Sequence, residues 1–134
     1  IHAAWATLVS EGEPQKAVFY ATSRDGKAFS PRVRVPTAGV TNPGHPQLTL
    51  TPDGGAAIVW DEMVDGVRRV SLSRVSRSGV FRPPQILSGG EPASHPVMVL
   101  SAGGDLVVAW TSRSPTSKSL SDPSQIRLMR IKVG

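Results

Sequence analysis

The stretch from His45 to Trp60 reads HPQLTLTPDGGAAIVW, and the stretch from His95 to Trp110 reads HPVMVLSAGGDLVVAW. The two align without a gap, with His-Pro at the start, a Gly-Gly pair near the middle and an apolar run closed by Trp. An offset of about 50 residues is within the range of sheet-forming repeats such as propeller blades. We therefore expect a repeat protein, and the remaining segments fit the same unit.

A third, partial copy of the unit precedes this match, and the similarity between repeats continues downstream of the Trp. Ala3-Ala4-Trp5 stands where Ile58-Val59-Trp60 stands, and Ser23 to Phe29 matches Ser76 to Phe81 with one residue more. The predicted repeats are 1–43, 44–93 and 94–134.

The middle repeat predicts four strands. They are Gln47 to Thr51, Ala56 to Glu62, Arg68 to Val75 and Phe81 to Leu87, joined by Asp- and Gly-containing turns that supply positive φ. The 13 Gly and 12 Pro of the chain argue against a helical bundle, because both residues interrupt helix interiors. The sequence predicts an all-β fold.

The three repeats do not predict the same number of strands. The first lacks its first strand and the last ends after its third, Gln125 to Ile131. We expect a β-propeller segment of four-stranded antiparallel blades, about three in number, with the first and last incomplete. Such a segment leaves sheet edges and flanks open. Either the chain is a fragment, or a further chain or another subunit completes the ring.

The run from Ser23 to Phe29 resembles the Asp-box of bacterial neuraminidase (BNR) repeats, with one residue missing between Asp25 and Gly26. Ser76 to Phe81 looks like a degenerate copy, with Ser78 in place of Asp. The surrounding His-Pro, Asp-Gly and Val-x-Trp frame is similar to sialidase-like propellers of secreted bacterial proteins. The resemblance covers nearly the whole chain and implies an extracytoplasmic location, periplasmic or secreted.

The Asp-box implies a fold and not a reaction. In the turn that begins at Ser23, Asp25 is expected to accept backbone N–H bonds, Gly26 to supply positive φ, and Phe29 to fill the gap between strands. In the family these boxes lie on the rim away from the active site.

A sialidase of this kind needs three arginines, a Tyr-Glu pair and an acidic residue, and this set is not visible in the chain. Tyr20 precedes the Asp-box in an alternating strand and is expected in the core. Arg127 and Arg130 share the last strand, where a spacing of three places them on opposite faces. Both remain candidate ligand-binding residues, and we expect no catalysis by this chain alone.

Four further residues are candidates for binding. Asp61 and Glu62 follow Trp60 at a strand end, where adjacent side chains point to opposite faces and cannot form the facing pair of glycoside hydrolases. The alternative for both is a solvated strand end.

His45 and His95 occupy equivalent positions before the first strands of their blades and are expected to point toward the same rim. Two imidazoles suggest a metal ligand pair, but His2 lies on a different strand, so we predict packing at a blade junction and no metal.

Two other features bear on partners. Trp5, Trp60 and Trp110 recur at equivalent positions, which favours packing between blades over sugar stacking. The Ser/Thr/Pro-rich stretch from Thr111 to Ser124 is much longer than the matching turn at Met63 to Val67. Such an insertion is either a mobile loop or a partner-specific contact surface.

Composition narrows the function classes. The chain has no Cys, which excludes disulfides and thiol chemistry, and its net charge of +5 favours acidic partners. The basic residues are scattered, so specific nucleic-acid binding is not predicted.

No apolar stretch approaches the roughly 18 residues of a transmembrane segment. No signal-peptide pattern follows Ile1, so we expect no leader within the chain.

The sequence favours a non-catalytic module that binds a glycan or a protein, or serves as a scaffold, without a cofactor. One alternative is a fragment of a secreted glycoside hydrolase of the exo-sialidase type, whose catalytic residues lie mostly outside this chain. Another is a subunit of a larger assembly completed by partner chains.

Overall fold

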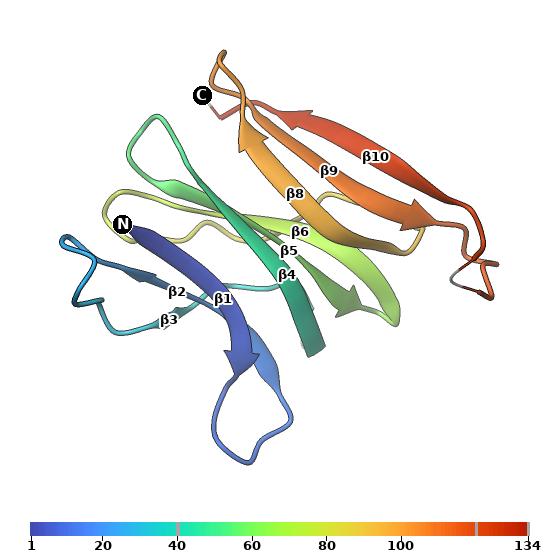
Figure 1. Ribbon diagram of the computed structural model, residues 1–134, viewed down its shortest axis with the longest axis horizontal. Helices are drawn as coiled ribbons and strands as arrows, with labels where there is room; N and C mark the ends of the chain where they lie inside the picture. The colour runs from blue at the N-terminus through green and yellow to red at the C-terminus, as the bar shows by residue number, and fades with distance from the viewer. Residues whose placement is uncertain (40, 120, 134) are drawn as a thin grey trace.

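The computed structural model describes residues 1–39, 41–119 and 121–133, which form three antiparallel β-sheets (Figure 1). The predicted repeats and the predicted long loop include residues 40, 120 and 134, which lie outside this description. The strands are β1 (His2–Leu8), β2 (Lys16–Thr22), β3 (Val33–Arg34), β4 (Thr41–Leu50), β5 (Ala56–Val64), β6 (Val67–Val75), β7 (Gln85–Ile86), β8 (Ala93–Leu100), β9 (Leu106–Arg113) and β10 (Ser124–Ile131). The described part of the chain contains no helix, and hence none long and apolar enough to cross a membrane.

The strands pair in sequence order within each sheet. The first sheet has the order β1-β2-β3, the middle sheet β4-β5-β6-β7 and the third sheet β10-β9-β8. The all-β prediction is therefore confirmed, as is the expected strand count of three, four and three.

The outer strand of the middle sheet is shorter than predicted. The sequence placed a strand from Phe81 to Leu87, whereas β7 covers only Gln85–Ile86 and Phe81 makes one isolated bridge to Val75. Pro83 and Pro84 lie between these two points. They have no N–H to donate, so the ladder is interrupted there.

The first strand of the middle sheet is longer than predicted and irregular. It begins at Thr41 rather than at Gln47, and its pairing with β5 shifts register between Thr41 and Gly44 and again between Gly44 and Gln47. Asn42 and His45 have φ values of 49° and 50°, which a regular strand does not allow. The irregularity lies just before Gln47, where regular pairing with β5 begins.

The sheets stack face to face, and the middle sheet is covered on both sides. Side chains of β5 alternate between two apolar clusters. Ile58 and Trp60 pack toward the first sheet with Val18 and Tyr20. Ala57 and Val59 pack toward the third sheet in a cluster completed by Val70, Leu72, Leu87, Ala93, Leu106, Val108 and Trp110. The core of the molecule thus consists of two layers between three sheets.

The central strands of the middle and third sheets differ in burial although the repeat makes them equivalent. In β5 every residue from Ala56 to Glu62 is buried. In β9 buried and half-buried residues alternate from Leu106 to Arg113. Only one face of the third sheet is covered by the described chain.

The tryptophan prediction holds for two of the three side chains. Trp60 is fully buried and Trp110 is 6% exposed, each in one of the two apolar clusters. Trp5 is half-buried and lies against Phe19, with ring centroids 6.2 Å apart. Tyr20 is buried, as expected from its place in an alternating strand.

The Asp-box turn forms as the sequence suggested, except for its aromatic residue. Asp25 Oδ1 accepts the backbone N–H groups of Lys27 at 2.8 Å and Ala28 at 3.1 Å. These bonds hold the pKa of Asp25 below its ordinary value, because they favour the ionised carboxylate. Ser23 Oγ accepts the N–H of Gly26, whose φ is 75°.

Phe29 does not fill a gap between strands; its side chain is 48% exposed. Phe81, its counterpart in the second repeat, packs edge-on against Tyr20 with centroids 5.6 Å apart. The second turn therefore supplies the packing that was predicted for the first.

Candidate functional site

His45 and His95 lie together at the junction of the middle and third sheets, where β4 and β8 contact each other. Their ring centroids are 3.8 Å apart and the ring planes are inclined by 32°. Both residues are exposed, both have positive φ, at 50° and 54°, and both precede a proline. The two equivalent histidines, which we expected to point toward the same rim, therefore lie against each other.

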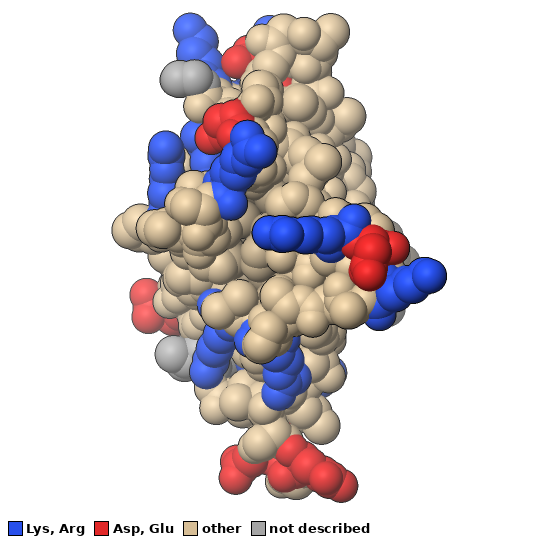
Figure 2. Space-filling view, turned by 90° about the vertical axis from the view of Figure 1, so that its left-hand side faces the viewer, with Lys and Arg blue, Asp and Glu red and all other residues tan. Residues whose placement is uncertain are grey.

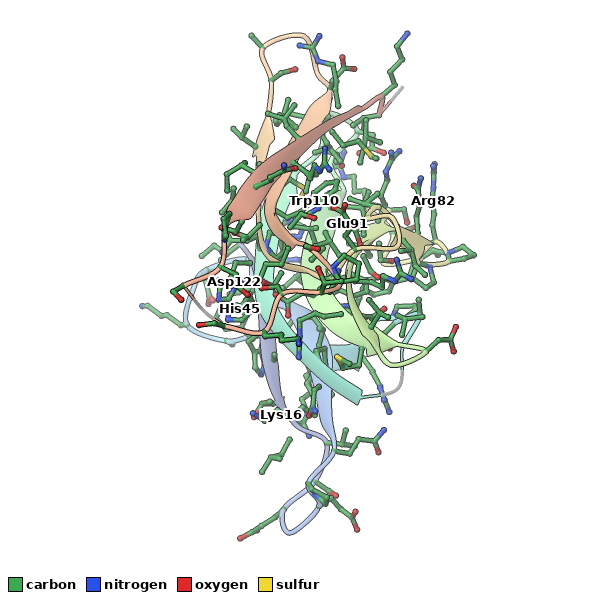
Figure 3. The ribbon with its side chains drawn as sticks, turned by 90° about the vertical axis from the view of Figure 1, so that its right-hand side faces the viewer. Lys16, His45, Arg82, Glu91, Trp110 and Asp122 are labelled. Carbon is green, nitrogen blue, oxygen red and sulfur yellow. The ribbon has the colours of Figure 1, made fainter. Side chains whose placement is uncertain are left out.

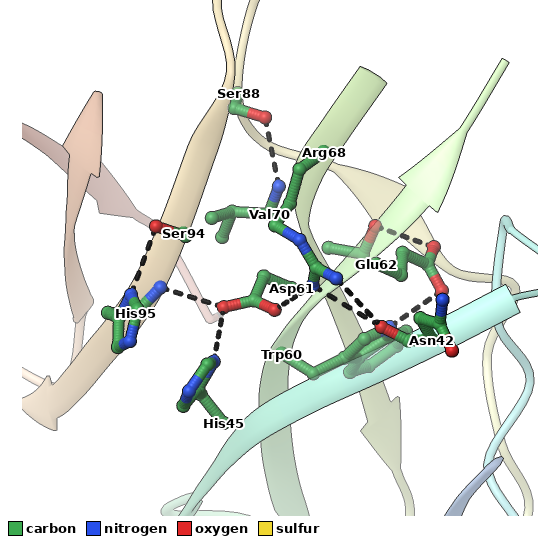
Figure 4. A network of polar contacts seen from close by, with 11 residues as sticks. Asn42, His45, Trp60, Asp61, Glu62, Arg68, Val70, Ser88, Ser94 and His95 are labelled. Atoms are coloured by element: carbon green, nitrogen blue, oxygen red, sulfur yellow. Dashed lines mark hydrogen bonds and ion pairs between the residues drawn. The ribbon is translucent and has the colours of Figure 1, made fainter. Parts of the chain in front are cut away.

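Asp61, on β5, lies next to both histidines and is fully buried (Figure 4). Its Oδ2 accepts the backbone N–H of His95 at 2.7 Å and lies 2.8 Å from His45 Nδ1. A carboxylate accepts hydrogen bonds and does not donate them, so the Nδ1 hydrogen of His45 is directed at Asp61. Asp61 thus connects the two histidines across the sheet junction.

Arg68 balances the charge of Asp61. Its Nη1 donates to Asp61 Oδ1, and both of its terminal nitrogens lie within 3.3 Å of the Asn42 carbonyl oxygen. In the β5–β6 register Arg68 is opposite Met63, two residue pairs closer to the turn than the pair of Asp61 with Val70. A buried carboxylate without such partners is strongly disfavoured, so Arg68 makes this burial possible.

Glu62 points to the opposite side of β5 and belongs to a different contact. Its Oε1 accepts the N–H groups of Ala38 and Gly39 and the hydroxyl of Ser71, each at 2.9 Å. Its Oε2 accepts Trp60 Nε1 at 2.8 Å. Glu62 is 1% exposed, so this network joins the segment after β3 to the middle sheet.

The alternative of a solvated strand end is therefore wrong for both Asp61 and Glu62. Each carboxylate is buried because a complete set of donors surrounds it. The expectation that the two side chains diverge to opposite faces is confirmed by their separate partners, His45 for one and Trp60 for the other. They do not form a facing acid pair.

Arg127 and Arg130 lie apart from this site and from each other. Arg127 Nη2 lies 3.4 Å from Glu91 Oε2. Both residues line a pocket of about 430 Å³ together with Asp122, and Figure 3 labels Glu91 and Asp122. Arg130 reaches Asp105 at 3.5 Å. Arg127 is paired with Trp110 and Arg130 with Val107 in the β9–β10 register, which places them on opposite faces as predicted.

In the long segment after β9, the carboxylate of Asp122 accepts several hydrogen bonds from nearby residues of the same segment. Asp122 Oδ2 accepts the N–H groups of Lys118 at 2.7 Å and Ser119 at 3.0 Å, and the hydroxyl of Ser117 at 3.2 Å. The two backbone bonds lower the pKa of Asp122. The described residues of this segment therefore form a hydrogen-bonded turn beside the pocket at Glu91.

The charged side chains on the face seen in Figure 2 are dispersed. Basic groups lie in several separate places with acidic and uncharged residues between them. This distribution agrees with the scattered positions of Lys and Arg in the sequence.

Three of the six predicted binding residues thus converge, namely His45, Asp61 and His95, while Glu62, Arg127 and Arg130 lie elsewhere. Sequence reasoning missed Arg68 and Ser94. Ser94 Oγ lies 3.0 Å from His95 Nδ1. A signal for Arg68 existed, because the turn at Asp65-Gly66 returns the next strand past Asp61.

Comparisons with known proteins found no matching family model, no similar curated protein and no similar solved structure.

Proposed function

We propose that the chain is a non-catalytic β-propeller segment of the sialidase-like type that acts as a scaffold, and that a further β-sheet covers the open face of its third sheet. The observation that carries this proposal is the contrast between β5, buried on both faces, and the equivalent strand β9, buried on one. The same repeat that places a neighbour on each side of the middle sheet leaves one side of the third sheet without one.

The repeat also identifies which face is open. Trp60 and Trp110 are equivalent, and each points toward the preceding sheet. Ala57 and Val59 point toward the following sheet, and their equivalents are Val107 and Ala109. The face that carries Val107 and Ala109 therefore corresponds to a face that is buried in the middle sheet.

The open face is largely apolar, although Arg130, opposite Val107, also lies on it. In the β8–β9–β10 register Leu128 is opposite Ala109, and Ala109 is opposite Val97. The exposed fractions of the large apolar residues are 57% for Val97, 59% for Val99, 72% for Ile126 and 68% for Leu128. A contiguous apolar patch of this kind is typical of a surface that contacts another protein. A glycan, which needs polar partners, fits this face less well.

The hydrolase alternative has no observation in its favour here. Tyr20, the only tyrosine of the chain, is 5% exposed and its hydroxyl lies 2.6 Å from His2 Nδ1. Burial raises its pKa, which makes the phenolate nucleophile of a sialidase harder to form.

The proposal is tested by sedimentation velocity and binding of an apolar fluorescent dye. We expect the wild-type chain, lacking its covering sheet, to self-associate with rising concentration and to bind the dye. Leu128→Lys places a charge on the open face and is expected to reduce both. Val80→Lys is the matched control, because Val80 is 65% exposed in the turn between β6 and β7.

The form of the association identifies the source of the covering sheet. A discrete oligomer indicates that a second copy of the chain supplies the covering sheet, whereas open-ended association shows only that the apolar face is uncovered. A wild-type chain that stays monomeric and binds no dye contradicts the proposal, and so does an equal response to Leu128→Lys and Val80→Lys.

A further inference from the structure

We propose that His45 and His95 together bind one divalent transition-metal ion through their Nε2 atoms, with Asp61 and Ser94 as positioning residues. This departs from the sequence-based expectation of no metal. His45, Asp61 and His95 each offer a ligand-type atom, and these atoms lie within 4.8 Å of one another. The site needs only the contact between β4 and β8 and is independent of what covers the third sheet.

Hydrogen bonding leaves the same nitrogen available on both rings. His45 Nδ1 is committed to Asp61, and His95 Nδ1 lies 3.0 Å from Ser94 Oγ. Among the described residues neither Nε2 has a hydrogen-bond partner. In Figure 4 the rings lie beside each other, with their second nitrogens turned away from Asp61 and Ser94.

The role of Asp61 follows from its own contacts. Its Oδ1 is held by Arg68, and its Oδ2 is held by His45 and by the His95 backbone, so all three partners are protein groups. A carboxylate that accepts the Nδ1 hydrogen of a histidine fixes the tautomer in which Nε2 binds metal. Asp61 therefore acts through His45 rather than as a direct ligand.

This carboxylate is specific to the junction at which the two histidines meet. At the equivalent position the third repeat has Thr111, and the partial first repeat has Ala6. Packing of two imidazoles alone does not require a buried, charged residue next to them. The arrangement of Asp61 next to the pair is accounted for if it orients a ligand.

The backbone at both histidines is strained. A φ near +50° costs roughly 1–2 kcal/mol for a residue with a side chain, and Gly or Asn occupies such positions more readily. The strain occurs at both equivalent positions, 45 and 95. Strained residues that converge on one point are a reason to infer a functional site.

The ligand set selects the kind of ion. Two imidazole nitrogens with water in the remaining positions suit Cu²⁺, Ni²⁺ and Zn²⁺, with Cu²⁺ bound most tightly. Mg²⁺ and Ca²⁺ require oxygen ligands and are not expected to bind here. The 51% exposure of the His45 side chain leaves room for the water ligands.

The experiment is a calorimetric titration of the full chain with Cu²⁺, Ni²⁺, Zn²⁺ and Mg²⁺. We expect one equivalent of Cu²⁺ to bind, with nitrogen hyperfine splitting from two imidazoles in its electron paramagnetic resonance spectrum. His45→Asn and His95→Asn each remove one ligand while keeping a residue that tolerates positive φ, and each is expected to abolish tight binding. His2→Asn is the matched control, because His2 is the third histidine and lies against Tyr20.

The positioning role has its own readout. Asp61→Asn is expected to weaken Cu²⁺ affinity by roughly 10- to 100-fold, with two-nitrogen coordination retained in the spectrum. Where Asp61→Asn proves unfolded by circular dichroism, Ser94→Ala provides the same test at His95. Absence of saturable Cu²⁺ binding overturns the proposal. Equal affinity of the wild type, His45→Asn and His95→Asn overturns it as well.

Discussion

Two buried carboxylates, each accepting several hydrogen bonds, connect separate parts of this protein. Glu62 joins four donors from separate parts of the chain, and Asp61 joins the middle and third sheets. Removing one partner from such a network costs more than the net value of its bonds, because the remaining donors stay buried without an acceptor. These positions therefore specify how neighbouring sheets meet.

Asp25 provides a test of pH dependence at this scale. Its pKa lies below the ordinary value of 3.8, so its ionised form stabilises the folded state. That stabilisation is fully present above the ordinary pKa and is lost as the pH falls through the folded pKa. We expect Asp25→Asn to lower the melting temperature at neutral pH and to match the wild type progressively in acid.

The measurement is thermal unfolding by circular dichroism across this pH range. Ser78→Ala, at the equivalent turn position of the second repeat, is the control, since it removes no charge. A difference between wild type and Asp25→Asn that stays constant down to acid pH contradicts the assignment of the turn bonds.

The sequence predicted which residues form the histidine site, but it did not predict that Asp61 is buried there. The equivalence of His45 and His95 follows from the repeat, and so does their convergence. The burial of Asp61 was missed because it depends on Arg68, a partner contributed by the next strand and fixed by its register. Single-sequence patterns do not encode such cross-strand pairs strongly.

At the scale of elements, alternation and turn residues predicted most strands, and proline explains the main exception. Strand β5 was predicted from Ala56 to Glu62 and runs to Val64. The outer strand was overestimated because apolar and β-branched residues flank Pro83 and Pro84, which interrupt the ladder. The extent of the outer strand thus depended on backbone N–H groups that proline lacks, which a pattern of apolar residues does not register.

The two tryptophans at equivalent positions of β1 and β5 give a matched test of sheet packing. Trp60→Phe removes buried volume and the Nε1–H donor of Glu62, and we expect a loss of about 2 kcal/mol in the free energy of unfolding. Trp5→Phe, at a half-buried position, is expected to cost well under half as much. Urea unfolding of both variants measures the difference, and equal losses would show that the first sheet is covered on both faces.

At the scale of the whole molecule, the three sheets form a stack, and among the described residues only the middle sheet has a neighbour on each face. The repeat in the sequence predicted three sheets with three, four and three strands. The stacking of their faces follows from the alternation of apolar residues in β5, which has a partner layer on each side. Closure into a ring requires more sheets than these three.

The stack makes a direct prediction for backbone protection. Strands β5 and β9 are equivalent by sequence, are central in their sheets and are paired on both edges. They differ in that no described part of the chain covers the face of β9 bearing Val107 and Ala109. Local opening is easier where fewer apolar contacts resist it.

Amide hydrogen exchange resolved by strand, at a concentration where the chain is monomeric, measures this difference most directly. We expect amides of 57–63 to exchange markedly more slowly than those of 107–113. Equal protection of the two strands would mean that both faces of the third sheet are already covered, and would contradict the account of an open stack.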